Sequence, residues 1–548
     1  MLNEKESFIN SILEKCSESK DYYNDYIEKL FSEMSSNNKN KIEVENIKKN
    51  IKKLVQHLEE LDKNPENQDL IQCLSCIFGS FLGDALGAYC EFKPADLKNI
   101  NRIFSGNPMF GDSQGQVTDD SEMAMSCAFG IMDNQDMLKL NSDYLYYYYG
   151  CWYLSHPRDV GYTTRNALYM FKTTEFDPNK KNNYQTNFKL IKNKNNSSLA
   201  NGFLMRTSTF IVWCYYRFKK IIEEAFNNSE NEKLFKLFQI IKIQAKKDNI
   251  CTHPNDNICI AHSCFCIMSL AAICGYNANH ILDFEENLLT NEYFNKDGAK
   301  EIKKMIMDEI NQHKKDKNEK ELNGDDLTQS EKGYHYFTKI KSVNMHMGYY
   351  VHAFRLTLYY LSYFDEINEE NGLTKFRIII NQICTYGGDT DTNASIVGAV
   401  IGPLIGYKYF GDSDFKKMIE LVPKYRYIFS PALMILYVYF LKESNNDGRI
   451  KNKMNFLRMI LNVRYGDIDI EILNKINSKN KENNNNTKEN IQINENEEDK
   501  EDLKEEDKKE NEKNHEEVKV KIKEKKEEEK NINEKEDIKK RDKITSNY

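Results

Sequence analysis

Long segments whose apolar residues recur three and four positions apart dominate the middle of the chain. This spacing places apolar side chains on one face of an α-helix, and the sustained alternation of a half-buried strand is absent. Proline, which breaks helix interiors, occurs only 9 times in 548 residues. The pattern predicts an all-α fold class with a single core, with helices over Met123–Met132, Leu145–Leu154, Ile258–Ile273, Val351–Phe364 and Ile396–Ile405.

Changes in composition divide the chain into three parts. Residues 1–67 carry apolar positions at helical spacing among Lys and Glu, which predicts a helical amino-terminal extension. Residues 476–548 are mainly Lys, Glu and Asn, so we expect a disordered charged tail. The main domain is predicted over residues 68–475, and Asn- and Lys-rich tracts predict polar insertions between its helices near 176–197, 226–233 and 311–333.

The charge pattern gives no indication of a nucleic-acid surface or a membrane anchor. The net charge is -8, and residues of both signs are interspersed. The amino terminus has early acidic residues and no basic region before its apolar residues, unlike a secretory or transit peptide. The apolar stretch Leu70–Phe92 contains Asp84 and Glu91, which favours a packed helix over a membrane span. We therefore expect a cytoplasmic protein.

The 13 cysteines are scattered, and their two tight pairs lie within apolar runs, which indicates reduced, buried thiols. Free core cysteines are typical of a reducing compartment. A zinc site around Cys264, with His253 and His262 nearby, is an alternative. It is less favoured because a second ligand pair at suitable spacing is absent.

The segment GGDTDT, residues 387–392, places two carboxylates on a turn before the apolar helix ASIVGAVIGPLIG. The glycines permit a tight turn and a close backbone approach. Asp389 and Asp391 can point into one site, and Thr392 can add a hydroxyl oxygen. Such an oxygen-only set suits a hard cation such as Mg²⁺ or Mn²⁺.

A second oxygen cluster, Thr118, Asp119 and Asp120, stands immediately before the predicted helix SEMAMSCAFGIM. The alternative interpretation is that the residues of each motif only cap their helix. Two adjacent aspartates are more than a cap requires. If both clusters converged, their carboxylates would repel one another strongly unless bound cations neutralised them.

A third segment, GSFLGDALGAYCEF at residues 79–92, has glycines at every fourth position of a predicted helix. Glycines on one helix face allow another helix to pack closely. The functional interpretation is that this packing brings Asp84 and Glu91 to the site. The alternative is a packing helix with a buried, satisfied Asp84.

With these motifs, the sequence resembles the ADP-ribosylglycohydrolase family from about Leu70 to about Tyr409, and within it the arginine-specific branch. The resemblance rests on GDALGAYCEF, GQVTDDSEMAMS, SHPRDVGYTTRNAL, NGFLMR, CTHPND, GYYVHAF and YGGDTDTNASIVGAVIGPLIG, which occur in the family's order. It implies an all-helical domain and a cofactor of two Mg²⁺ or Mn²⁺ ions. The implied metal ligands are Thr118, Asp119, Asp120, Asp389, Asp391 and Thr392.

The resemblance also implies catalytic residues. Glu91 should face the metal site and position water or substrate, Asp120 is both ligand and catalytic residue, and Asp159 should act in catalysis or ribose binding. Either Asp159 or Glu91 can be the carboxylate that deprotonates the attacking water. Tyr162 departs from the Asn that the bacterial relative carries, which puts the local hydrogen bonding and acceptor specificity in doubt.

The resemblance also implies substrate-binding residues in the segments NGFLMR, CTHPND and GYYVHAF, and at the two glycines of GGDTDT. The alternative for Arg206 is a buried ion pair, and that for His253 is a structural histidine. Tyr349 and Tyr350 can stack on adenine, or can belong to the core. The implied set is Asn201, Gly202, Met205, Arg206, His253, Gly387, Gly388 and Tyr350.

The function implied is an enzyme that hydrolyses the N-glycosidic bond of ADP-ribosylated arginine. Its partner is an ADP-ribosylated protein or an ADP-ribosyl metabolite, and the sequence leaves the oligomeric state open. One alternative is a hydrolase for serine-linked or other O-linked ADP-ribose. Another is a protein that binds ADP-ribose without catalysis, since a fold can persist after activity is lost.

Overall fold

The computed structural model describes Ser11 and residues 41–97, 113–134, 139–173, 184–227, 231–296, 298–323, 329–369, 372–423 and 426–443. These residues belong to one compact unit, Met1–Lys475. Within them the structure is helical, apart from turns and one isolated bridge between Ala200 and Tyr349. The predicted all-α class is confirmed.

The first half of the described chain is built from α-helices that alternate with short 3-10 turns. The five segments predicted as helices from apolar spacing are all helical. The α-helices are α3 (Lys41–Leu61), α4 (Gln68–Gly87), α5 (Asp119–Asp133), α6 (Ser142–Leu154), α7 (Tyr162–Leu168), α8 (Met170–Thr173), α9 (Gln185–Asn195), α10 (Thr207–Asn227), α11 (Asn231–Asn249) and α12 (Asp256–Ile273).

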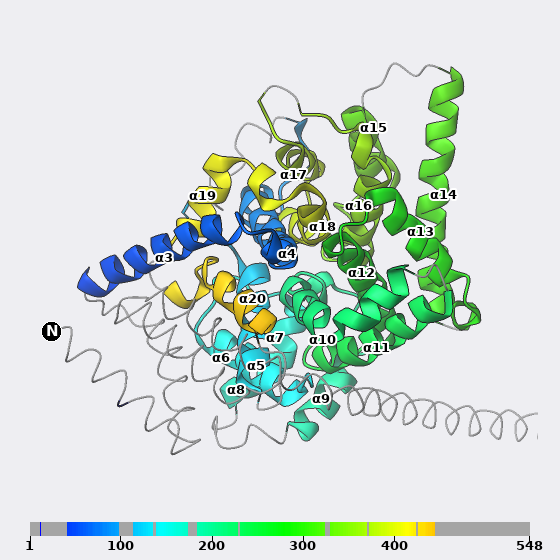
Figure 1. Ribbon diagram of the computed structural model, residues 1–548. Coiled ribbons are helices and arrows are strands. Elements are labelled where there is room, and N and C mark those ends of the chain that lie inside the picture. The colour runs from blue at the N-terminus through cyan, green and yellow to red at the C-terminus, as the bar shows by residue number, and fades with distance from the viewer. Residues whose placement is uncertain are drawn as a thin grey trace, which may run out of the picture. The chain divides into compact units, whose positions relative to one another are not determined.

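The second half continues with α13 (Ala278–Leu289), α14 (Ala299–Asn323), α15 (Gln329–His335), the π-helix η7 (Tyr336–Ile340), α16 (Tyr350–Ser362), α17 (Lys375–Tyr386), α18 (Thr390–Ile405), α19 (Asp412–Glu420) and α20 (Leu433–Glu443). Figure 1 shows α4 and α18 near the middle, with α3 at one edge and α14 at the opposite edge.

Helices α4 and α18 form the most extensive helix pair of the domain. Their backbones approach closely because Gly79 and Gly83 of α4 face Gly398 and Ala394 of α18. A methyl group on either α4 glycine would overlap the carbonyl group of the facing helix. The close approach predicted from the glycine spacing is therefore confirmed, and it fixes how the two helices lie against each other.

Replacing Gly83 by Ala is expected to lower the free energy of unfolding by at least about 2 kcal/mol, because overpacking forces backbone shifts. The added Cβ would lie 2.6 Å from the Ala394 carbonyl carbon. The matched control is Gly161→Ala, where a Cβ meets nothing within 4 Å. Urea unfolding of both variants measures the effect, and equal losses would contradict this account.

Two predicted polar tracts are partly helical rather than breaks between helices. Helix α9 occupies much of 176–197, because Phe188 and Ile191 are buried while the intervening residues face outward. Helix α14 continues from Ala299 into the first half of 311–333; it buries Ile306 and Ile310 before the tract and His313 within it. The high Asn and Lys content belongs to the exposed faces of these amphipathic helices.

Part of the predicted domain organisation lies outside the described residues. Helix α3 belongs to the predicted amino-terminal extension and buries Ile51, Leu54 and Leu58. Residues 1–10 and 12–40 of that extension, and the predicted tail 476–548, are not described. The three-part division therefore stays a prediction.

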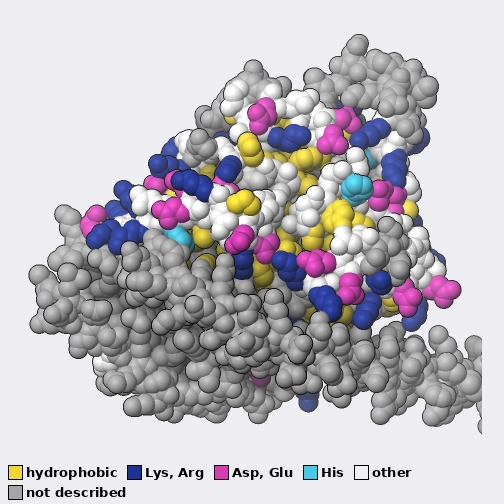
Figure 2. All heavy atoms as spheres, viewed as in Figure 1, with side chains coloured by type: hydrophobic (Ala, Val, Ile, Leu, Met, Phe, Trp, Pro, Cys, Tyr) yellow, Lys and Arg dark blue, Asp and Glu magenta, His cyan; other side chains and the backbone are white. Residues whose placement is uncertain are grey.

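Two helical stretches, Pro65–Cys90 and Asp256–Ile273, are long and apolar enough to cross a membrane. Within the domain, however, 94% and 89% of their apolar windows are buried. Core helices have this property. On the described part of the face in Figure 2, Lys and Arg side chains are interspersed with Asp and Glu.

Candidate metal centre

The carboxyl-terminal end of α4 holds the first turn of α18 in place. A Cβ on Gly87 would lie 2.5 Å from the Cα of Asp391, so only glycine allows this approach. The Thr390 hydroxyl also donates to the Gly87 carbonyl at 2.8 Å. Asp84, one turn earlier on α4, is thereby brought close to Asp391.

The Gly387–Gly388 turn brings Glu91 to the same place. Both glycines have positive φ angles, +71° and +81°. Their backbone pairs with the segment after α4: the Phe92 N–H donates to the Gly388 carbonyl at 2.8 Å, and the Gly388 N–H donates to the Lys93 carbonyl at 3.2 Å. This pairing sets Glu91 beside Asp389 at the start of α18.

The carboxylates converge as two overlapping groups that share Asp391. Asp84, Asp120 and Asp391 form one group, and Glu91, Asp389 and Asp391 form the other. Within each group, one oxygen of every side chain lies within 4.8 Å of the others. All five side chains are buried, at 8% exposure or less. Asp120 of the first aspartate motif thus lies beside Asp391 of the second.

Helix capping alone does not explain these motifs. Thr118 and Asp389 stand at the N-cap positions of α5 and α18, but neither makes a side-chain capping hydrogen bond. The Thr118 and Thr392 hydroxyls instead donate to the same oxygen of Asp120, at 3.2 and 3.3 Å. The N–H groups at the start of α5 are satisfied by Asp84, which accepts from Thr118 and Ser121.

The cluster has the electrostatics of a cation site. Burial raises the pKa of Asp84 to about 6. Burial also raises the pKa values of Asp120 and Asp391 well above the ordinary range, and neighbouring carboxylates raise them further. One oxygen of Asp120 is buried without a hydrogen-bond partner. A buried, oxygen-only set with mutual repulsion fits a hard divalent cation.

Asp119 and Asp159 lie at the more accessible edge of this cluster. Both are half-buried. Burial raises the pKa of Asp119 well above its usual range, and the charges of Asp120 and Asp159 add to the shift. Burial raises the pKa of Asp389, and the charge of Asp159 adds to that shift. The carboxylate of Asp159 is thus near both aspartate motifs, with its own Val160 N–H donating to it at 2.8 Å.

The predicted substrate segments NGFLMR and GYYVHAF meet at the site. Asn201 donates from its side chain to Asp389 at 2.6 Å, and its backbone N–H donates to the Gly348 carbonyl at 2.8 Å. Gly202 approaches His253 so closely that a Cβ would lie 3.0 Å from the imidazole. Asn201 is therefore in direct contact with the carboxylate cluster.

Other predicted substrate residues are buried in the structure. Arg206 is fully buried and forms an ion pair with Asp248 at 3.1 Å, with the Tyr149 ring 4.4 Å away. This geometry is that of the ion-pair alternative. Tyr350 is buried and its ring packs against Phe203.

Met205 and His253 are buried as well. Burial, aided by the charge of Arg206, lowers the pKa of His253 well below its usual range. Its Nε2 atom has no hydrogen-bond partner. Substrate binding by these four residues, Met205, Arg206, His253 and Tyr350, stays a prediction.

The alternative zinc site finds no support in the described part of the chain. There, the two carboxylate groups are the only groups of His, Cys, Asp or Glu close enough to hold an ion. His262 instead contacts Thr207 and Asn249 through its two ring nitrogens. The described cysteines are free thiols, and all except Cys274 are buried.

Two features of the site were not included in the predicted set. Asp84 was considered but left out, although its place one residue after Gly83 on the glycine face was the available signal. The second feature is Glu122 of α5, which is buried in contact with Arg426 and Trp152. No sequence signal indicated these contacts, because the three residues are far apart in the chain.

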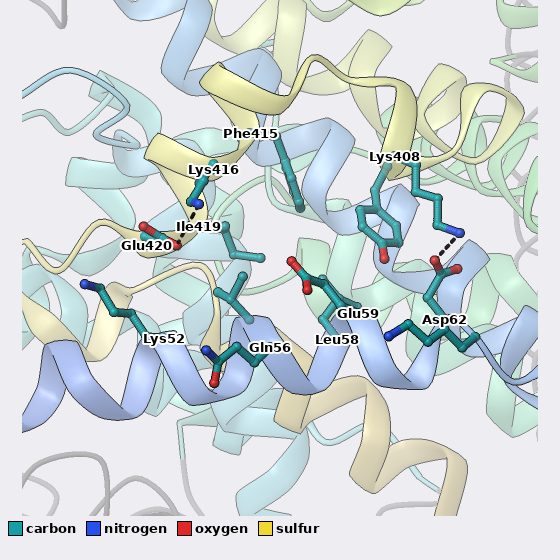
Figure 3. Close-up of a pocket in the computed structure, with 13 residues that line it drawn as sticks. Lys52, Gln56, Leu58, Glu59, Asp62, Lys408, Phe415, Lys416, Ile419 and Glu420 are labelled. Atoms are coloured by element: carbon teal, nitrogen blue, oxygen red, sulfur yellow. Dashed lines mark ion pairs between the residues drawn. The ribbon is translucent and has the colours of Figure 1, made fainter.

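A separate groove of about 840 Å³ lies between α3 and α19. Apolar residues such as Leu58 and Ile419 line it together with Lys and Glu side chains, and Lys408 pairs with Asp62 (Figure 3). None of the clustered carboxylates lines this groove. Its charged side chains are partly paired with one another, as Lys408 is with Asp62 and Lys416 with Glu420. The candidate metal site is the buried carboxylate cluster rather than this groove.

An all-α domain with a buried carboxylate cluster at the meeting point of three helix ends has the features of a helical protein that could hold a metal ion. Comparison with known proteins identifies the family. The model of the ADP-ribosylglycohydrolase family matches residues 66–413, and the chain belongs to that family of glycohydrolase enzymes.

Individual relatives agree with this assignment at low identity. A protein of Acanthamoeba polyphaga mimivirus whose name assigns it to the ADP-ribosyl glycohydrolases is 26% identical over 349 residues, 61% of this chain and 87% of its own length. An ADP-ribosylarginine hydrolase of Serratia proteamaculans is 32% identical over 108 residues, 19% of this chain and 29% of its own.

The ADP-ribosyl-[dinitrogen reductase] glycohydrolase of Rhodospirillum rubrum is 31% identical over 118 residues, 20% of this chain and 37% of its own length. The chain therefore spans about a third of the latter two relatives. A solved structure, an ADP-ribosylglycohydrolase-related protein complex, is 18% identical and covers 69% of this chain and 100% of its own, with a TM-score of 0.41.

Proposed function

We propose that the protein hydrolyses the N-glycosidic bond between ADP-ribose and an arginine side chain of a modified protein, with two Mg²⁺ or Mn²⁺ ions at the carboxylate cluster. The observation that carries the proposal is the convergence of the two aspartate motifs on one buried site, with Asp159 beside both. Family membership supports the substrate class.

Two ions fit the two overlapping carboxylate groups, with Asp391 shared between them. The residues that would hold the ions are Asp84, Asp120, Asp389, Asp391 and Glu91, together with the hydroxyls of Thr118 and Thr392 and the carboxylate of Asp119. When bound, such ions orient the ribose hydroxyls and lower the pKa of the attacking water.

The positions of Asp159 and Glu91 suggest different roles for them. Glu91 is buried within one carboxylate group, so we assign it to ion binding and orientation. Asp159 is half-buried at the edge, outside both groups, where its free carboxylate oxygen can accept the proton of the attacking water. Cleavage at the ribose C1 passes through an oxocarbenium-like state.

The arginine linkage is supported by the relatives. One relative is named an ADP-ribosylarginine hydrolase, and its match covers a short part of both chains. The competing candidate is the release of ADP-ribose from serine or from another O-linked acceptor. The two linkages differ in the leaving group, which is the guanidine of arginine or the hydroxyl oxygen of serine. They therefore differ in how the site must protonate that group. We also propose a cytoplasmic location, which the free buried thiols support.

Incubation of the purified chain with arginine-linked and serine-linked ADP-ribosyl peptides tests the proposal. We expect release of free ADP-ribose from the arginine-linked peptide only, with Mg²⁺ or Mn²⁺ present and not with a chelator. A double variant, Asp119→Ala with Asp391→Ala, serves as the inactive control. Release from the serine-linked peptide alone would overturn the linkage, and metal-independent release would overturn the proposed centre.

A further inference from the structure

Arg426 is a buried charge directly behind the acidic end of α5. It is 6% exposed and donates through Nη2 to Glu122 at 2.7 Å, with Nε donating to the other oxygen of that carboxylate. Glu122 lies on α5, within one turn of Asp119 and Asp120. The bidentate pair is the geometry that a guanidinium forms best with a carboxylate.

The same guanidinium holds the end of α6. Its Nη1 donates to the carbonyl of Ser155 at 3.0 Å, the residue that follows the last turn of α6. The Trp152 indole N–H, also on α6, donates to Glu122 at 2.8 Å. Arg426 and Glu122 therefore join the acidic end of α5 to the carboxyl-terminal end of α6.

The end of α6 leads directly to Asp159. The turn after Ser155 contains His156 in the left-handed region, with φ +55°, a conformation that non-glycine residues keep only when their surroundings hold it. Burial, and next the charge of Arg426, lowers the pKa of Arg158, which places the neighbour of Asp159 close to Arg426. The path from Arg426 to Asp159 is thus short, because Arg426 binds the Ser155 carbonyl four residues before Asp159.

We propose that Arg426 is a positioning residue that sets the Asp159 carboxylate against Asp119 at the edge of the cluster. The inference rests on the proposed function, in which Asp159 accepts the proton of the attacking water. Arg426 lies beyond residues 66–413, which the family model matches. The catalytic unit of this chain accordingly extends past that match, to the segment before α20.

The test is the variant Arg426→Lys, measured with the full chain, Mn²⁺ and the substrate peptide that the wild type cleaves. A lysine keeps the charge, but its single ammonium cannot bind both Glu122 oxygens and the Ser155 carbonyl at once. We expect kcat to fall about tenfold or more with KM nearly unchanged, because misplacing a reacting group by a fraction of an ångström is costly. Glu122→Gln should act in the same direction.

The matched control is Arg377→Lys, which weakens the Arg377–Asp414 pair at 2.6 Å between α17 and α19. All assays are run well below the unfolding midpoint of each variant. A merely structural role for Arg426 predicts that both lysine variants lose stability alike and keep the wild-type kcat. That result would overturn the proposal.

A double-mutant cycle with Asp159→Asn gives the decisive readout. If Arg426 acts through Asp159, the double variant is no slower than Asp159→Asn alone; if the two losses multiply, the positioning role is wrong. An unimpaired Asp159→Asn would instead remove the proposed role of Asp159, and with it this inference. An inactive wild type that binds Mn²⁺ would refute the proposed function, and with it the role of Asp159 on which this inference rests.

Discussion

Asp391→Asn is expected to lower kcat more than a hundredfold and to abolish tight Mn²⁺ binding, while the metal-free protein becomes more stable. Asp391 belongs to both carboxylate groups, so the substitution removes a negative charge and one side-chain oxygen from each. Changes to residues that merely support metal ligands already cost about 10- to 100-fold, and a shared ligand should cost more. The gain in stability follows because one of several repelling buried carboxylates becomes neutral.

The loss of Mn²⁺ binding and the gain in stability can both be measured on one preparation of the Asp391→Asn variant. Isothermal titration with Mn²⁺ reports binding, and thermal unfolding after removal of metal reports stability. Asp414→Asn, which breaks the Arg377 pair on α19, is the control and should bind Mn²⁺ normally and lose stability. Asp391→Asn that bound Mn²⁺ as tightly as the wild type would show that the ions lie elsewhere.

The second large expected effect is that the metal-free protein becomes less stable as the pH rises, and that bound metal reverses this trend. In the metal-free protein, burial raises the pKa of Asp84 to about 6 from an ordinary value of 3.8, and it also raises the pKa values of Asp120 and Asp391 well above the ordinary range. A carboxyl group with a raised folded-state pKa stabilises the fold fully below its unfolded pKa and loses that contribution as the pH rises. The unfolding midpoint should therefore fall from about pH 4 through pH 6 and beyond.

Divalent cations should reverse this trend, because they neutralise the ionised cluster. At a concentration of 100 times Kd, one bound ion adds about 2.7 kcal/mol to the free energy of unfolding. The gain should be largest near pH 8, where the carboxylates are ionised, and small near pH 5. Calorimetry at pH 5, 6, 7 and 8 with and without Mg²⁺ measures it. A midpoint that rises with pH in the metal-free protein, and a gain from Mg²⁺ that is equal at all four values, would contradict the assigned cluster.

The fold class could be predicted because helical spacing of apolar residues is a local property. The same spacing explains why the tract 176–197 is largely helical: Phe188 and Ile191 of α9 are enough to bury one helix face inside a tract that is mostly Asn and Lys. Composition averages over both faces of a helix, whereas burial depends on one face. Polar tracts therefore do not by themselves mark loops.

The acidic site could be predicted in part for a similar reason. Asp389, Asp391, Asp119 and Asp120 stand in two short motifs, and their repetition before helices indicated a shared role. Arg426 could not be found this way, since its partner Glu122 is 304 positions away and neither residue stands in a motif. Arg206 shows the converse: it stands in a motif, yet the structure pairs it with Asp248 in the interior.

The carboxylate cluster draws Asp84 from near the beginning of the domain and Asp389 and Asp391 from near its end. Proteins leave the ribosome amino terminus first. The nascent chain thus carries Asp84, Glu91 and Asp120 through most of its synthesis without the residues that complete the centre. A chain that stops before α18 cannot assemble either carboxylate group, because both groups include Asp391. The complete cluster can therefore form only after the first turn of α18 has left the ribosome.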